Sequence, residues 1–147
     1  MSFSASAIAL SISKLAIPGV IVLDLSEIPE LADLRGGPLL FPNLSNWGGE
    51  MNIEQGNISR GPLAYYEVTR DLGYIYLHEN AGAGRGIADY TIAMSNNRDA
   101  IIEALCEMTD VDVRNIKSGP IGKMLDINEN EFYGFLLTIT VWEQINP

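Results

Sequence analysis

Leu63-Ala-Tyr-Tyr-Glu-Val-Thr-Arg-Asp-Leu-Gly-Tyr-Ile-Tyr-Leu-His78 is the stretch that decides the fold, together with the residues that follow it. Its tyrosines and β-branched residues favour extended structure, so we predict one long strand over Leu63–Leu77. Asp71-Leu-Gly73 in its middle indicates a bulge or a bend. The loop Ala81-Gly-Ala-Gly-Arg-Gly86 comes next, and Ile87–Leu105 then predicts a helix. Nucleotide sites and ordinary β-to-α connections share this order of strand, glycine loop and helix.

The helix expected after the glycine loop has apolar residues near helical spacing. They are Ile87, Tyr90, Met94, Ile101 and Leu105. The polar run Ser95-Asn-Asn-Arg-Asp99 interrupts this pattern, which predicts either a kink or two shorter helices. Cys106 falls late in the same apolar pattern, where a buried and inert thiol is expected.

Several short elements are expected before the long strand. Ser4–Leu15 has apolar residues at helical spacing and predicts a short amphipathic helix, although Ser11-Ile-Ser13 also alternates as a strand does. Pro18-Gly19 breaks that helix. The β-branched run Val20–Leu23 predicts a buried strand. Pro38–Pro42 is apolar between two prolines, which confines it to a short or an edge strand.

An exposed excursion separates these elements from the long strand. It covers Asn43–Gly61, is rich in Asn, Gly and Ser, and predicts a weak strand around Met51–Glu54. A long loop of this kind is either functional or mobile. Further strands are expected after the helix, and the last has apolar residues on both faces, which predicts a central place in the sheet. These strands cover Val111–Ile116, Gly122–Asp126 and Phe132–Val141.

The order of elements predicts the fold class. The chain of 147 residues is the size of one domain, and no linker or repeat divides residues 1–147. Strands cluster in the chain instead of alternating with helices. This predicts an α+β domain with a mostly antiparallel sheet and two main helices packed on one face.

Composition limits the class of protein. With 47% hydrophobic and 19% charged residues, the chain is globular in composition. No apolar run approaches the ~20 residues of a membrane span, and the first positive charge is Lys14, so we expect a soluble, unexported protein without a membrane partner. One cysteine excludes an intrachain disulfide, and with a single histidine it makes a Cys/His zinc site implausible.

The net charge of −10 argues against nucleic acid as a ligand. Affinity for a polyanion comes largely from lysine and arginine, and the chain has 9 of them against 19 acidic residues. The arginines are scattered instead of clustered. Acidity of this size is consistent with a basic protein partner or with a pore wall to which DNA must not adhere.

No motif predicts catalysis. The glycines of Gly82–Gly86 are spaced one residue short of the dinucleotide fingerprint, and the Walker lysine is absent, so we expect a turn that leads into a helix. His78 and Glu79 are adjacent on a strand and point to opposite faces, which disfavours an acid–base pair. Acids at three-residue intervals from Asp24 to Asp33 are typical of a solvated face. We therefore expect a protein that is not an enzyme, with no cofactor and no metal.

The order of these segments resembles the tail terminators and other head–tail joining proteins of long-tailed bacteriophages. The likeness covers nearly the whole chain. An amphipathic N-terminal helix leads into a short strand, and the tyrosine-rich strand, the glycine loop and a closing aromatic strand follow. The residues that carry it are Gly19-Val-Ile-Val22, Asp24-Leu-Ser-Glu-Ile-Pro29, Pro38–Pro42, Tyr74–His78, Gly82–Gly86, Phe132-Tyr-Gly-Phe135 and Thr140-Val-Trp-Glu143.

The resemblance implies a structural role in the virion. Tail terminators form rings, usually of six subunits, that cap the tail tube, stop its polymerisation and offer a surface to the head. The implied partners are further copies of the chain, the tail tube protein and a head-completion or connector protein, with assembly in the host cytoplasm and DNA passing through unbound. Head closure and tail completion in the same neck remain alternatives, and a nucleotide-binding module is a third. The expected interface residues are Trp47, Arg60, Tyr74, Tyr76, Arg85 and Glu143.

Overall fold

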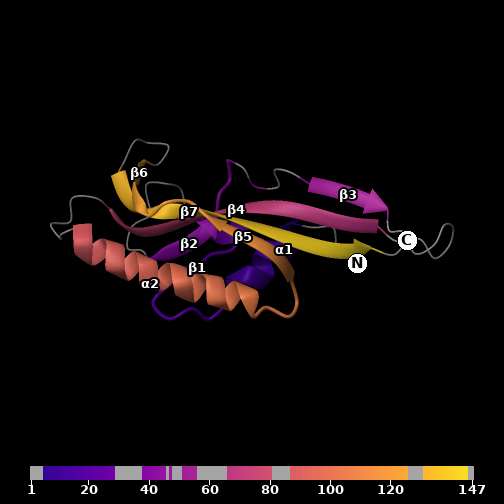
Figure 1. The fold of residues 1–147 in the computed structure, drawn as a ribbon, viewed down its shortest axis with the longest axis horizontal. Coiled ribbons are helices and arrows are strands. Elements are labelled where there is room, and N and C mark those ends of the chain that lie inside the picture. The colour runs from indigo at the N-terminus through magenta and orange to yellow at the C-terminus, as the bar shows by residue number, and fades with distance from the viewer. Residues whose placement is uncertain are drawn as a thin grey trace.

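A computed structural model of the chain describes residues 5–28, 38–45, 47, 51–55, 66–80, 87–125 and 131–145. Helices and strands follow one another in the order expected for an α+β chain (Figure 1). They are α1 (Ala5–Ser13), β1 (Ile21–Val22), the 3₁₀ helix η1 (Leu25–Glu27), β2 (Leu39–Pro42), β3 (Met51–Gln55), β4 (Tyr66–Asn80), α2 (Ile87–Cys106), β5 (Asp112–Ser118), β6 (Gly122–Leu125) and β7 (Glu131–Ile145).

The two longest strands, β4 and β7, form the centre of a seven-stranded sheet. Its main order is β1-β2-β4-β7-β5, with β3 beside one half of β4 and β6 beside one end of β7. The described pairs are antiparallel except β1 with β2, which is parallel. The expected central place of the last strand and the weak strand near residue 51 are both confirmed.

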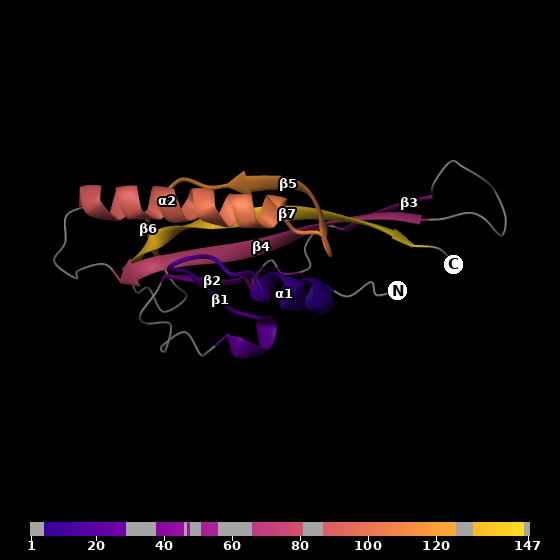
Figure 2. The same ribbon diagram turned by 90° about the horizontal axis from the view of Figure 1, so that it is seen from below.

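Both helices pack on one face of the sheet, as predicted (Figures 1 and 2). Side chains of a strand alternate between its two faces, so every second residue of β4 and β7 points to the helices. These residues form one core with Ile8 and Ile12 of α1 and with one side of α2. The sheet residues of this core that are at most 1% exposed are Leu40, Leu72, Tyr74, Tyr76, Phe135, Leu137, Ile139 and Val141.

The opposite face of the sheet carries a smaller apolar cluster at the end where β2, β4 and β7 meet. It contains Leu39, Phe41, Leu77 and Phe132, with Ile28 and Met124 packed against it. Sheet residues buried on both faces explain why the closing strand has apolar residues at neighbouring positions. Leu136, on this second face, is 44% exposed, so this face of the sheet is only partly buried.

The irregularity of β4 lies at His78 and not within Asp71–Gly73. The register between β4 and β7 runs without a break from Tyr66 to Leu77 and shifts between Leu77 and Glu79. Close to this shift, a Cβ atom added at Gly134 would collide with the carbonyl oxygen of Tyr76. Glycine at this position therefore permits a close approach of two backbones that any larger residue would prevent.

Helix α2 is a single run of 20 residues, so the expectation of two shorter helices is wrong. Met94 and Ile101 are buried on either side of its polar middle. Part of that middle also reaches the core, because Asn97 donates a hydrogen bond to the hydroxyl of Tyr76 and Arg98 lies over the ring of Phe135. The expectation of a buried thiol is wrong. Cys106 is exposed, because it lies one residue, and hence about 100°, beyond the buried Leu105.

The N-terminal helix ends before the residues that were expected to break it. Helix α1 stops at Ser13, and Gly19, with φ of +76°, forms a tight turn between Ile17 and Val20. Glycine adopts this left-handed conformation at little energetic cost. The strand after the turn, β1, is only two residues long.

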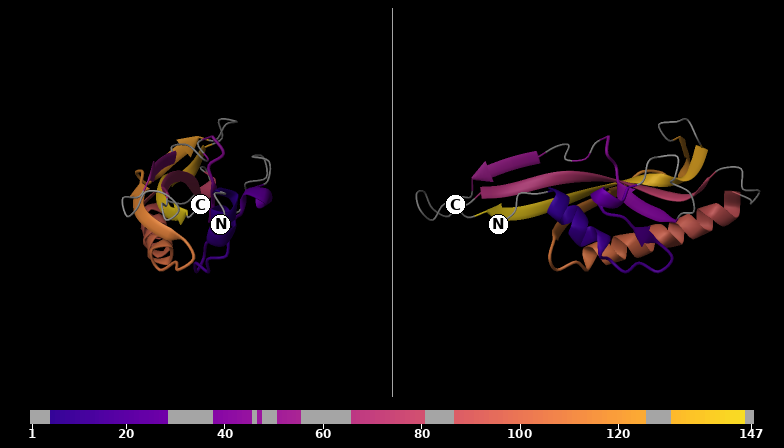
Figure 3. Two further views of the ribbon diagram at one scale, coloured as in Figure 1. Left: turned by 90° about the vertical axis from the view of Figure 1, so that its right-hand side faces the viewer. Right: turned by 180° about the vertical axis from the view of Figure 1, so that it is seen from behind.

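The molecule is elongated, because β4 and β7 each extend over 15 residues while α1 and α2 cover only part of their length. In Figures 1 and 3, one end of the sheet projects beyond both helices. We call this projection the arm. It consists of β3, Tyr66–Asp71 of β4 and Thr140–Ile145 of β7.

Candidate functional site

The arm exposes an apolar face on the side of the sheet that carries the helices. Cross-strand pairs place Met51 opposite Arg70 and Ile53 opposite Val68, and both pairs share the face of Tyr74 and Tyr76. Met51 is 51% exposed and Ile53 is 50% exposed, whereas Val68 on the inner strand is 1% exposed. Outer apolar side chains left in water on one side of a strand mark a surface suited to contact.

The opposite face of the arm is polar and acidic. Glu54 lies directly opposite Glu67 across β3 and β4. Like charges in this position destabilise a strand pair. Further along the same face, Thr140 donates a hydrogen bond of 2.7 Å from its hydroxyl to Asp71. The two faces of the arm therefore differ. Met51, Ile53 and Val68 lie toward the helices, together with Glu143, whereas Glu54, Glu67 and Asp71 lie on the opposite face.

Strands β3 and β5 have open outer edges within the described part of the chain. Each pairs with one described strand, β3 with β4 and β5 with β7. At the base of the arm the register aligns Met51, Arg70, Val141 and Val113 in one row across four strands. An open edge presents unpaired backbone amide and carbonyl groups, which readily accept a strand from another chain.

The directions of the two outer strands are opposite. Every neighbouring pair in the row β3-β4-β7-β5 is antiparallel, so β3 and β5 run in opposite senses. If β3 of one copy lay beside β5 of another with both sheets facing the same way, the new pair would also be antiparallel. Every neighbouring pair of strands would then be antiparallel, within each copy and between copies.

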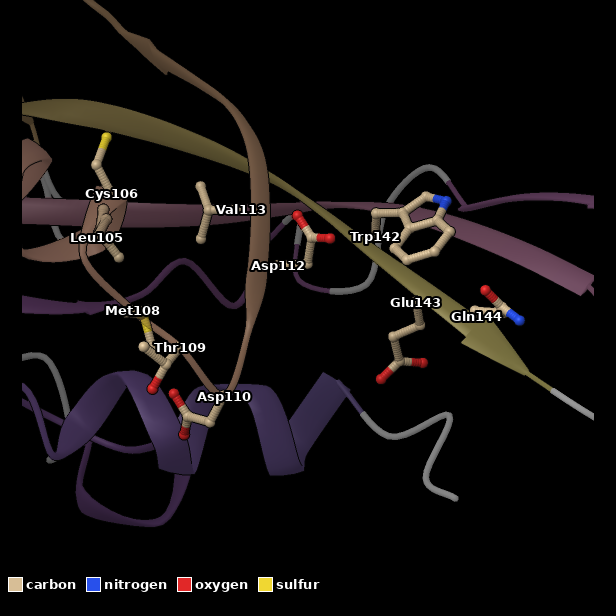
Figure 4. Close-up of a pocket in the computed structure, with 10 residues that line it drawn as sticks. All are labelled: Leu105, Cys106, Met108, Thr109, Asp110, Asp112, Val113, Trp142, Glu143 and Gln144. Atoms are coloured by element: carbon tan, nitrogen blue, oxygen red, sulfur yellow. The ribbon is translucent and has the colours of Figure 1, made fainter.

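A hollow of about 440 Å³ lies where the end of α2 turns into β5, beside the last residues of β7 (Figure 4). Met108 and Val113 contribute apolar surface to it next to the fully buried Leu105, and Asp110 and Glu143 contribute carboxylates. Glu143 Oε2 is buried without a hydrogen-bond partner among the described residues. The remaining lining residues are Cys106, Thr109, Asp112, Trp142 and Gln144.

Arg114 covers Trp142 at the edge of the hollow. Its guanidinium carbon lies 4.5 Å from the ring centroid of Trp142. The same guanidinium donates to both carboxylate oxygens of Asp112, at 2.7 Å and 3.0 Å. The hydrogen bonds to Asp112 raise the pKa of Arg114 above its ordinary value. This arrangement fixes a charged, planar group beside the open β5 edge.

A polar network is embedded in the core near the other end of the sheet. The Asn97 side-chain amide donates 2.8 Å to the Tyr76 hydroxyl, which lies 2.7 Å from His78 Nδ1. Because the tyrosine oxygen accepts from Asn97, its own proton is available to His78. Burial raises the pKa of Tyr76 to about 12, and the hydrogen bond from Asn97 acts in the opposite direction. This arrangement ties α2 to β4 and gives His78 a hydrogen-bond partner in the core.

The expected interface residues divide into four groups. Tyr74 and Tyr76 are 0% exposed, so their assignment to an interface is corrected to the core. Trp47 packs edge-on against Tyr74, with ring centroids 5.5 Å apart, and is half-buried against the same core. Glu143 lines the hollow. Arg60 and Arg85 lie outside the described residues, as do Gly82–Gly86 and most of the expected excursion.

Burial explains the correction at the two tyrosines. Their alternation with Ile75 and Leu77 left open which face points to solvent, and two helices cover the face that carries them. Residues Met51 and Ile53 were missed as contact candidates. Their alternation with Asn52 and Glu54 was the available signal. An edge strand whose one face is apolar is suited to packing against a partner on that face.

The acidic residues before β2 are partly described. The amide of Asp24 donates 3.0 Å to Glu27 Oε1, and Ser26 donates 2.9 Å to Asp24, so these groups organise the short helix η1. Among the described residues, no group of three or more His, Cys, Asp or Glu side chains is arranged to hold a metal ion. No helix in this part of the chain has the length and apolarity needed to cross a bilayer.

Strand β5 runs in the same direction as β4, but β7 lies between them and pairs with both. The direct parallel return strand of a dinucleotide-binding unit is therefore not formed by these two strands. No protein-family model and no curated protein matches the chain.

Proposed function

We propose that this protein is a structural ring subunit of a bacteriophage tail neck, and specifically a tail terminator. The ring is a homo-oligomer, with six copies as the expected number, that caps the tail tube, ends its polymerisation and presents a surface to the head. The role needs neither catalysis nor a cofactor. Its partners are neighbouring copies, the tail tube protein and a head-completion or connector protein within the virion.

The observation that carries this proposal is the pair of open edges on β3 and β5. They lie on opposite sides of the four-stranded row and run in opposite directions. Two different surfaces that complement each other produce a heterologous contact, which generates a closed ring when the rotation between copies closes. A self-complementary dimer needs instead one surface that pairs with itself.

The two faces of the arm support an assignment of inside and outside in such a ring. With the helices on the outer side, the face that carries Glu54, Glu67 and Asp71 lines the channel. A channel with this charge repels the phosphate backbone, so DNA slides through it without being held. The net charge of −10 favours the same result.

The proposal is tested first by the mass of the purified protein. Light scattering on a size-exclusion column, over a range of protein concentrations, is expected to show a species close to six times 16.1 kDa as concentration rises. A mass that stops at twice the subunit mass contradicts a ring. Introduction of a charge at Ile53 (Ile53→Lys) is expected to shift the transition to higher concentration, whereas Ile92→Lys, at an exposed site on α2, serves as the control.

The second test separates a terminator from other neck proteins. Growing tail tubes are mixed with the purified ring, and their lengths are measured by electron microscopy. A terminator shortens the tubes and leaves a cap on one end. Tubes of unchanged length without caps contradict the terminator assignment and favour head closure or tail completion.

A further inference from the structure

The apolar side chains of β3 and the hollow beside β5 lie on opposite edges of the same sheet. Met51 and Ile53 project from the outermost strand on one side and are about half exposed. The hollow borders the outermost strand on the other side, where Met108 and Val113 form its apolar part (Figure 4). Within the described residues of one copy, no side chain fills the hollow and no strand covers the outer edge of β3.

The two surfaces also occupy the same side of the sheet. Met51 and Val113 are the ends of one cross-strand row, so their side chains share the helix-bearing face. A second copy that adds β3 to the outer edge of β5 therefore brings Met51 and Ile53 to that face. The end of α2, with Leu105, lies beneath the sheet there, and the hollow borders it.

We propose that the hollow of one copy receives Met51 and Ile53 from strand β3 of the next copy around the ring. This inference rests on the proposed ring and names the contact that joins its subunits. Backbone groups of β3 and β5 pair at the edge, and the two apolar side chains fill the space between β5 and the end of α2. The contact is heterologous, because each copy gives β3 on one side and its hollow on the other.

The open edges favour a second copy as the occupant, because β3 and β5 each pair with one described strand and run in opposite directions. The chain carries −10 overall, so copies repel one another and a stable contact needs uncharged groups at its centre. Met51 and Ile53 supply them on one side, and Met108 and Val113 supply them on the other. The strand also brings backbone amides toward the hollow, and an amide is the kind of donor that Glu143 Oε2 lacks.

Cys106 provides a direct test, because it is the single cysteine, is exposed and lines the hollow. Ile53→Cys places a second thiol on the apolar face of β3, and Met51→Cys does so two residues away, which covers a different strand register. Asn52→Cys, on the same strand and the opposite face, is the matched control. Each full-length variant is treated with a short bis-maleimide and separated on a denaturing gel.

The expected result is a ladder of covalent species beyond the dimer for Ile53→Cys or Met51→Cys. Asn52→Cys and the double variant Ile53→Cys/Cys106→Ser are expected to give at least roughly tenfold less product beyond the dimer, which corresponds to about 1.4 kcal/mol of selectivity. A ladder of this kind requires each copy to use its two thiols on two different neighbours.

Three results overturn the inference, and they separate it from the proposed ring. Product that stops at the dimer means that two copies contact each other reciprocally. A ring mass in light scattering without any ladder means that the ring exists but is joined elsewhere. A monomer mass at every concentration, without a ladder, contradicts both the contact and the proposed ring.

Discussion

The body and the arm of this molecule use one sheet in two different ways. Tyr66, Tyr74 and Tyr76 lie on the same face of the same strand, β4. In the body, under the helices, Tyr74 and Tyr76 are 0% exposed, whereas Tyr66 at the tip of the arm is 40% exposed. Residue type and strand are the same, so the difference comes from the cover that the helices and Trp47 provide over the body.

This contrast separates the roles of the two regions. Side chains of the body are enclosed by a sheet and two helices, and their burial supplies most of the stability of one copy. Side chains at the outer edge of the arm have a partner strand on one side only. They contribute little to the stability of one copy and retain apolar surface for contact with another.

The largest expected effect is a loss of stability when a body side chain is truncated. Phe135→Ala removes a fully buried ring that stacks on Tyr76 at 4.6 Å, and it is expected to lower the free energy of unfolding by about 3–5 kcal/mol. The matched arm variant Ile53→Ala, at a half-exposed site, is expected to lower it by less than about 1 kcal/mol. Urea denaturation at a concentration that holds both variants monomeric measures each value. Equal losses of unfolding free energy at Phe135 and Ile53 would contradict the distinction between body and arm.

A smaller effect is expected at the polar network between α2 and β4. Tyr76→Phe keeps the ring but leaves Asn97 Nδ2 and His78 Nδ1 without the hydroxyl between them. The expected loss is about 1–3 kcal/mol, because buried polar groups lose their partner. Tyr66→Phe, at the exposed tip, is the control and is expected to leave the urea midpoint unchanged.

The pH dependence of the same variant sharpens the comparison. Burial raises the pKa of Tyr76 to about 12, above the value near 10 of an unfolded chain. Its stabilising contribution is therefore complete below pH 10 and declines as pH rises toward 12. The wild type is expected to lose more stability between pH 10 and 11.5 than Tyr76→Phe. Parallel pH profiles of the two proteins, measured by urea denaturation, contradict this assignment.

The smallest effect is expected on the acidic face of the arm, and it has the opposite sign. Glu54→Lys replaces one member of the like-charge pair Glu54–Glu67 and is expected to stabilise one copy by about 0.2–1 kcal/mol. Glu131→Lys is the control in the body, because Glu131 lies 3.2 Å from Lys123 and the change creates repulsion there. Thermal denaturation in low salt measures both shifts. Both are expected to shrink in 1 M salt, where the Debye length falls to about 3 Å.

Much of the fold was predictable from local patterns. The long tyrosine-rich strand, the helix after the glycine loop and the closing strand all follow from periodicity, and the structure has them as β4, α2 and β7. The α+β class and the packing of both helices on one face are confirmed as well. Each of these elements is long, and long periodic segments carry the strongest local signal.

The errors occurred where tertiary packing determines which side chains are buried and where a strand is irregular. Alternation along β4 does not say which face the helices cover, so Tyr74 and Tyr76 were assigned to the surface although they form the core. The thiol of Cys106 was assigned to the core, although one residue of helical rotation takes it away from Leu105. The bulge at His78 has no glycine to mark it, and the glycine that permits the close approach, Gly134, is on the partner strand.

The most direct test of the central claim is hydrogen exchange of backbone amides at two protein concentrations, one on each side of the assembly transition. The outer strands β3 and β5 each pair with one described strand, so their outward amides exchange freely in a single copy. The account predicts that assembly slows exchange in Met51–Gln55 and Asp112–Ser118 while the body of β4 is unaffected. A rise in mass with unchanged exchange in both outer strands would contradict the claim that the open edges join the copies.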